Sequence, residues 1–216
     1  MTFRELVYMC LDEVKLVSDD SYITEDHVLF LIGKYRNFLL RQKYDKTNMS
    51  PEDSNFQEIK ITIDKGKDVS EEEVLIPFPL SVPRVYTYNN GYTSDIAFVS
   101  KHRFRFVGHN SYLDNINYCT INTKHKLQTS KVIDENNDTD VYMWAIFEDC
   151  VKAAELSFDG DVLDAECPIE SSLISGVQEL VVKDILGVAY RPQDTINNGA
   201  DDLSTIGVTN NNRRRE

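Results

Sequence analysis

Residues 25–44 read EDHVLFLIGKYRNFLLRQKY, and this stretch decides how the helical part of the fold is arranged. Val28, Leu31, Ile32, Tyr35 and Leu39 recur at steps of three and four, which predicts an amphipathic helix. Further apolar side chains widen this stripe beyond one face: Leu29, Phe30, Phe38 and Leu40. A helix that is apolar nearly all round is either buried centrally or touches a second body. Both interpretations stay open here, and the four widening residues are the candidate subunit contact.

The segment before this helix predicts another one. Thr2 and Glu5 have the spacing of a capping box, and apolar residues recur at helical spacing from Phe3 to Val17. Thr24 is then the expected N-cap of the second helix, with acidic residues in the first turn, where the helix dipole favours anions.

Residues 51–147 predict a β-rich module. Ile59, Ile61 and Ile63 alternate with polar residues, which is typical of a strand with one buried face. Prolines at 77, 79 and 83 exclude a central strand and predict an extended edge segment. Further strands are expected at 96–99, 103–107, 116–121, 124–129 and 142–147, with 122–123 as a tight hairpin connection.

Helical periodicity returns after residue 147. We expect a short helix over 148–156 and a longer one that has Pro168 in its first turn and ends at Pro192. The remaining residues are too polar to fold alone and predict an extended C-terminal arm. Because helices at both ends of a chain usually pack together, we predict an α+β fold. Its helical body comprises residues 1–50 and 148–191, with residues 51–147 inserted and residues 192–216 as the arm.

The charge balance is acidic. The 216 residues carry a net charge of −13, and residues 148–190 hold ten acidic but only two basic side chains. A protein that wraps nucleic acid normally has a basic face, so this balance argues against that class. The four cysteines form no CxxC pair, which favours reduced, partly buried thiols over a zinc site. The acidic, interrupted N-terminus is not a signal peptide, and no stretch is long enough to span a bilayer, so we expect a soluble protein made in a cytoplasm.

No pattern predicts catalysis, a cofactor or a metal. Residues 134–140 space their acids like a calcium loop but lack the Gly and Glu of an EF-hand, which favours a solvated turn. His102, His109, His125 and Cys119 match no metal-ligand spacing. On a strand, Lys101–Phe106 would place basic side chains on one face and aromatic ones on the other. A charged outer face over an aromatic core face is the plainer account of that segment. An alternative function is a small-molecule or nucleic-acid binding module, which such a strand would serve.

Several stretches together resemble ring-type head–tail connector (adaptor) proteins of podovirus-like, crAss-like bacteriophages. The opening stretch, residues 6–44, is LVYMCLDEVKLVSDDSYITEDHVLFLIGKYRNFLLRQKY. Residues 103–118 (RFRFVGHNSYLDNINY), 145–156 (AIFEDCVKAAEL) and 179–203 (ELVVKDILGVAYRPQDTINNGADDL) follow in the same order. Cys150 stands where the family pattern has Pro, which bears on one turn only.

The resemblance implies a virion structural protein and not an enzyme. The alternative, a small-molecule or nucleic-acid binding module, would act in the infected cell. Copies would form a closed, dodecameric connector ring below the portal, join head to tail and continue the DNA channel for genome packaging and ejection. The β-rich module would face neighbouring rings and the arm would dock on the portal protein. Double-stranded DNA would pass without sequence-specific binding, and neither a cofactor, a metal nor a membrane is implied.

The implied ring role points to two sets of residues, one at the subunit interface and one at the channel wall. A ring contact uses different faces of neighbouring copies, so we expect the interface to combine the 25–44 helix with the arm. The arm residues are Pro192, Asp194, Asn197, Asn198, Asp201, Asp202 and Leu203. An acidic wall would repel passing DNA, which makes the loop between the closing helices a candidate lumen surface. Its candidate residues are Asp159, Asp161, Asp164 and Glu166.

Overall fold

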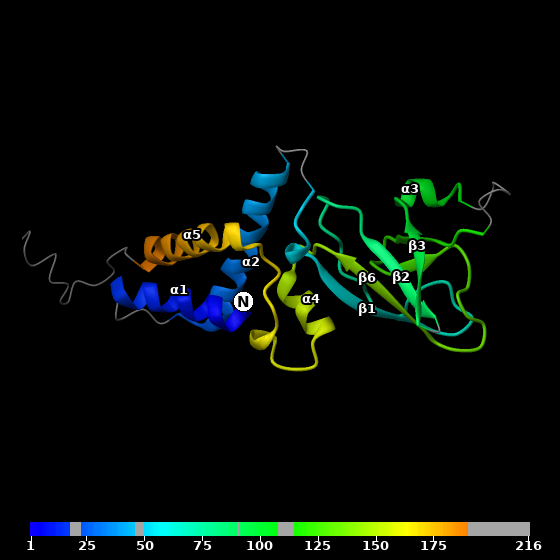
Figure 1. The fold of residues 1–216 in the computed structure, drawn as a ribbon, viewed down its shortest axis with the longest axis horizontal. Coiled ribbons are helices and arrows are strands. Elements are labelled where there is room, and N and C mark those ends of the chain that lie inside the picture. Colours follow the sequence, from blue (N-terminus) through cyan, green and yellow to red (C-terminus); the bar gives the residue numbers. More distant parts are fainter. Residues whose placement is uncertain (18–22, 46–49, 90, 108–114, 190–216) are drawn as a thin grey trace, which may run out of the picture.

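Helices and a curled sheet occupy opposite ends of an elongated molecule, as the computed structural model shows (Figure 1). The structure describes residues 1–17, 23–45, 50–89, 91–107 and 115–189. The helices are α1 (Phe3–Val17), α2 (Glu25–Tyr44), α3 (Lys101–Phe104), α4 (Cys150–Ser157) and α5 (Ser171–Ala189), with short 3-10 turns η1 (Asp53–Asn55) and η3 (Val162–Asp164). The strands are β1 (Gln57–Ile63), β2 (Arg84–Asn89), β3 (Tyr92–Phe98), β4 (Tyr118–Ile121), β5 (Leu127–Thr129) and β6 (Thr139–Ala145). The predicted α+β class is confirmed.

Both predicted helix starts are capped as the sequence indicates. The Glu5 amide donates to the Thr2 hydroxyl at 3.2 Å, and the Thr2 amide donates to the Glu5 carboxylate at 2.9 Å. Thr24 precedes α2 in an extended conformation, and its hydroxyl accepts from the His27 amide at 3.3 Å. These bonds satisfy amides that have no partner inside the first turn of a helix.

Helices α1, α2 and α5 pack around one apolar core. Lys34 pairs with Asp184 and Lys43 pairs with Glu170, so α2 runs antiparallel to α5. At the close contact between these helices, a Cβ on Gly176 would lie 3.1 Å from the Leu39 side chain. The short helix α4 links this core to the next one, because Cys150 and Ala154 belong to the helical core while Ala153 lies under the sheet.

The sheet has the strand order β1-β6-β2-β3-β4-β5 in the described residues. All pairs are antiparallel except β3 with β4. Alternating burial along β1 places Ile59, Ile61 and Ile63 in a second core on one face of the sheet. The chain after β1 then pairs with the opposite edge strand, where the Ser70 amide donates to the Leu127 carbonyl at 2.9 Å. This contact covers the β5 edge, which protects it from pairing with another chain.

Three local expectations are wrong. Residues 103–107 form no strand, because the parallel pair β3–β4 needs a crossover and this segment supplies it as α3 and its following turn. Lys101, Arg103 and Arg105 therefore share no strand face. The 122–123 hairpin is a longer loop in which Asn122 bonds to Lys126 at 2.9 Å and His125 adopts a left-handed φ of 56°. Pro168 lies before α5, which begins only at Ser171.

Candidate subunit interface

A buried arginine joins the helical end of the molecule to the sheet. Arg36, on α2, is fully buried, and its guanidinium donates to three main-chain carbonyls. Its acceptors are the carbonyls of Pro168 at 2.6 Å, Asn55 at 2.9 Å and Phe147 at 3.1 Å. These residues stand before α5, before β1 and after β6, so one side chain fixes three chain segments at the junction.

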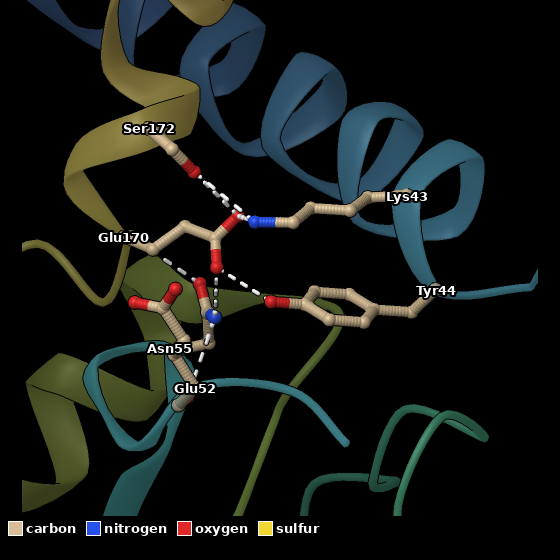
Figure 2. A network of polar contacts seen from close by, with 6 residues as sticks. All are labelled: Lys43, Tyr44, Glu52, Asn55, Glu170 and Ser172. Carbon is tan, nitrogen blue, oxygen red and sulfur yellow. Dashed lines mark hydrogen bonds and ion pairs between the residues drawn. The ribbon is translucent and has the colours of Figure 1, made fainter. Parts of the chain in front are cut away.

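Glu170 forms a second buried centre beside Arg36. Figure 2 shows the side chains of Lys43 and Tyr44 reaching its carboxylate from the end of α2, at 2.6 and 2.5 Å. The hydroxyl of Ser172 donates to the same carboxylate at 3.0 Å, and the amide of Asn55 donates at 3.4 Å. Because the Asn55 carbonyl also accepts from Arg36, the two centres form one polar network. We call this network, Arg36 with Asn55 and Glu170, the joint.

The electrostatics of the joint favour an ionised carboxylate. Burial alone would raise the pKa of Glu170, but hydrogen bonds led by the Lys43 ammonium outweigh burial and lower it. The same contact raises the pKa of Lys43. A buried carboxylate with several donors is stable only while those donors stay in place, so the joint resists relative motion of the parts it connects.

An apolar groove lies where the helical end meets the sheet. It is lined by α2, by α4 and by residues 73–76, and its volume is about 520 Å³. Three of its apolar side chains stay exposed: Phe30 by 67%, Ile76 by 54% and Leu156 by 43%. Soluble monomers seldom leave several large apolar side chains uncovered around one hollow, so the groove is a candidate contact surface.

The four candidate contact residues of α2 divide into two pairs. Leu29 and Leu40 are buried within the chain itself, in the helical core and in a small cluster with Phe78. Phe30 and Phe38 lie on the outer face and are exposed by 67% and 55%. Only the second pair is therefore available for a contact with another molecule.

The candidate lumen loop is partly neutralised by the chain itself. Arg4 donates to Asp161 at 2.8 Å and to Asp164 at 2.7 Å, and the contact with Arg4 lowers the pKa of Asp164. Asp159 and Glu166 are exposed. The loop thus presents a smaller negative charge than its sequence indicates.

Comparison with known proteins gives these surfaces a context. A family model described as phage tail ring protein 2 matches residues 5–203. A curated relative, "Ring protein 2" of Bacteroides phage crAss001, is 38% identical over an alignment that covers 94% of this chain and 98% of the relative. The chain belongs to the phage tail ring protein 2 family. The predicted resemblance to crAss-like phage ring proteins is thereby confirmed.

The matched range of this tail ring protein family contains the joint, the groove and the exposed face of α2. Of the expected arm, residues 192–203 fall inside the match, although they lie outside the residues that the structure describes. The arm residues Pro192, Asp194, Asn197, Asn198, Asp201, Asp202 and Leu203 consequently stay a prediction.

In the part of the chain that the structure describes, no group of three His, Cys, Asp or Glu side chains could hold a metal ion, and none of the helices combines the length and the apolar character of a membrane span. All four cysteines are free, as predicted, and all are buried. Burial raises the pKa of the Cys10 thiol to about 12, which makes it a poor nucleophile.

The joint was not predicted from the sequence. Arg36 carried a local signal, because it stands four residues from both Ile32 and Leu40 and so lies on the buried face of α2. Glu170 carried none, since its partners Lys43 and Asn55 are more than a hundred residues away.

Proposed function

We propose that this protein is a subunit of a closed, dodecameric connector ring below the portal, which joins head to tail and continues the DNA channel. The support is its membership of the tail ring protein 2 family, together with apolar surface that its own fold leaves uncovered. Packaging and ejection of the genome would pass through the ring without sequence-specific contact with DNA.

Two separate apolar faces suit a ring contact. A ring is closed by heterologous contacts, in which one face of each copy meets a different face of the next. Phe30 and Phe38 provide one face on α2, while Tyr8, Met9 and Leu16 remain exposed on α1. We propose that α2 of one copy packs against the helical end of its neighbour.

The acidic loop would line the channel in this arrangement. Asp159 and Glu166 would supply its repulsive charge, since Asp161 and Asp164 are paired with Arg4. At physiological salt this repulsion extends about 8 Å, which is enough to discourage adhesion of DNA at the wall. The sheet would face neighbouring rings, and the arm would attach the subunit to the portal or to an adjoining copy.

Mass measurement of the purified protein, alone and with the portal protein, tests the proposed ring. We expect a defined ring of identical copies on the portal, and a Phe30→Ser/Phe38→Ser variant that remains folded but assembles poorly. Tyr92→Ser is the matched control for the contact between copies of the ring, because Tyr92 is 81% exposed but lies on the sheet, which this contact does not include. A protein that stays monomeric with the portal, or a double variant that assembles normally, would contradict the proposed contact.

Removal of residues 193–216 tests the arm. The sequence of this segment is too polar to fold alone, so we expect an unchanged thermal midpoint and a weaker attachment to the portal or to neighbours. Unchanged assembly of the shortened chain would refute this role.

A further inference from the structure

The outer face of α2 alternates aromatic and cationic side chains. Four exposed residues follow one another at steps of four, four and three: Phe30, Lys34, Phe38 and Arg41. Residues at these steps share one face of a helix, and this face extends over about 16 Å. We call these four residues the α2 stripe.

The outer face of α1 carries the matching pattern in reverse. From the C-terminal end of α1, four exposed residues follow at the same steps: Leu16, Asp12, Tyr8 and Glu5. We call these four residues the α1 stripe, which alternates apolar and anionic side chains.

The two stripes match when the helices run antiparallel. Each aromatic side chain of the α2 stripe then lies opposite an apolar or aromatic one, and each cation lies opposite an anion. The pairs are Phe30 with Leu16, Lys34 with Asp12, Phe38 with Tyr8, and Arg41 with Glu5. A parallel pair with Lys34 opposite Asp12 would place Arg41 opposite residue 19, beyond the last residue of α1. The antiparallel direction is therefore the one that matches all four positions.

The anions of the α1 stripe have no counter-charge in the described part of the chain. Glu5 accepts a hydrogen bond from the Thr2 amide at 2.9 Å, and no described cation lies within ion-pair distance of Glu5 or Asp12. Asp12 is exposed on the same face as Leu16, whose side chain is 86% exposed. The α1 stripe is thus an apolar surface with uncompensated negative charge.

The cations of the α2 stripe can meet that charge. Arg41 lies 3.7 Å from Glu148, and both side chains are more than half exposed, so this ion pair holds the guanidinium weakly. Lys34 donates to Asp184 at 3.0 Å and to the Tyr35 hydroxyl at 3.4 Å, which takes two of its three donors. Arg41 is therefore the cation of the α2 stripe with more freedom to take a new partner.

The stripes of one chain point away from each other's helix. α1 and α2 turn their opposite faces to the same helical core, with Leu6 and Cys10 from α1 and Val28 and Ile32 from α2. The outer face of α1 lies at the end of the molecule remote from the sheet (Figure 1). A contact between the stripes consequently needs a second copy of the chain. Because it joins two different faces, this contact is heterologous, as a ring requires.

We propose that the α2 stripe of each copy packs antiparallel on the α1 stripe of the next copy, with Lys34 opposite Asp12. This inference rests on the proposed ring and names the partner surface, the direction and the register of its subunit contact. The apolar side chains supply most of the affinity, since exposed ion pairs contribute little. The charges exclude other registers, in which like charges or unpaired charges would meet.

Charge reversal in the full-length chain, assembled with the portal protein, tests the register. Arg41→Glu places two carboxylates opposite each other, and we expect the concentration for half-maximal assembly to rise about tenfold or more. Adding Glu5→Arg restores opposite charges and should recover most of this loss. Arg84→Glu is the matched control, because Arg84 is 56% exposed but lies on the sheet.

Recovery in the double variant has no explanation in stability. Glu5→Arg also removes the acceptor of the Thr2 amide, so its effect on the fold would make assembly worse and not better. A double variant that assembles no better than Arg41→Glu alone overturns the proposed register.

Disulfide trapping between two full-length chains tests the direction. One chain carries Arg41→Cys and the other Glu5→Cys, and they are mixed with the portal protein under mild oxidation. The four native cysteines are buried, so the introduced thiols react first. We expect a cross-linked pair of chains, because a disulfide forms only when the two Cβ atoms approach to about 4 Å. Leu16→Cys in place of Glu5→Cys is the control, since it lies about 16 Å along α1 and is favoured only by a parallel pair.

The mass of the same mixture separates this inference from the proposed function. Rings in which the Glu5→Cys chain cross-links no more than the Leu16→Cys chain would refute the antiparallel contact and leave the ring intact. The expected cross-link in particles of only two copies would support the contact and refute the ring. The absence of both would refute the two together, and a cross-link formed within a single chain that carries both cysteines would overturn the inference.

Discussion

Replacement of Arg36 by methionine is the change that tests the joint most severely. The buried guanidinium donates to the carbonyls of Pro168, Asn55 and Phe147 at 2.6, 2.9 and 3.1 Å. Methionine fills much of the same space but donates no hydrogen bond. Three buried carbonyls, from three separate segments, would lose this donor at once.

The expected cost follows from those three contacts. A buried polar group left without its partner costs about 1–3 kcal/mol, which gives an upper range of about 3–9 kcal/mol for the three carbonyls. The substitution also removes a buried charge, whose desolvation penalty of several kcal/mol offsets part of that loss. We expect a net loss of about 3–5 kcal/mol, a large share of the roughly 5–15 kcal/mol that stabilises a typical domain.

Urea unfolding followed by two probes provides the assay. Far-ultraviolet ellipticity reports mainly on the helices, and fluorescence of the single tryptophan, Trp144, reports on the sheet, where it stacks on Phe56 at 4.0 Å. We expect the two transitions to coincide in the native chain and to separate in the Arg36→Met variant, because the joint couples the two ends. Lys183→Met is the control, since its pair with Glu179 is solvent-exposed on both sides and contributes little to stability. A loss below about 1 kcal/mol with coincident transitions would refute the reasoning.

Four further substitutions probe the fold and the contact surface. Burial raises the pKa of Glu170, but hydrogen bonds led by the one from Lys43 outweigh burial and hold this pKa below its usual 4.5. The ionised Glu170 carboxylate therefore stabilises the folded state above pH 4.5, and this stabilisation is lost as the pH falls through the pKa of the folded state. Glu170→Gln should therefore weaken the acid-induced step in unfolding free energy, and an unchanged pH profile would count against the joint. Leu40→Ala should cost about 2–5 kcal/mol because Leu40 is fully buried, whereas Phe38→Ala should change stability by no more than about 0.5 kcal/mol and weaken assembly. Equal losses of unfolding free energy in the two variants, measured by chemical denaturation, would contradict the assignment of Leu40 to the core and Phe38 to the surface. Thr24→Ala should lower stability by about 1 kcal/mol through loss of the N-cap of α2, as measured by the thermal midpoint, and no shift would contradict the cap.

The elements that could be predicted are those with local signals. The capping residues Thr2 and Thr24 satisfy amides only three residues away, so their patterns suffice to place the starts of α1 and α2. The alternation at Ile59, Ile61 and Ile63 likewise reports directly on a strand with one buried face.

The remaining structure depends on partners far away in the sequence. The alternation in Lys101–Phe106 is typical of a strand, yet this segment forms α3 and a turn within the crossover between parallel strands. Nothing within six residues can reveal that β3 and β4 run parallel. The joint is equally non-local, since Arg36 and Pro168 are separated by 132 positions.

The sequence also could not show which single residues of α2 are available for the candidate interface. The wide apolar surface of α2 indicates that the helix has more contacts than one face can make, but not which side chain makes which contact. Leu40 packs inside the chain, whereas Phe38, two positions earlier, is exposed. The distinction arises from the cluster around Phe78, a residue of the proline-containing segment that packs against Leu40. Periodicity along α2 carries no information about that contact.

Imaging of purified phage particles at a resolution that traces helices tests the central claim most directly. We expect this chain in a closed ring below the portal, with the outer face of α2, at Phe30 and Phe38, against the helical end of the next copy. Its absence from particles, or a position in which that face of α2 meets only solvent, would contradict the account.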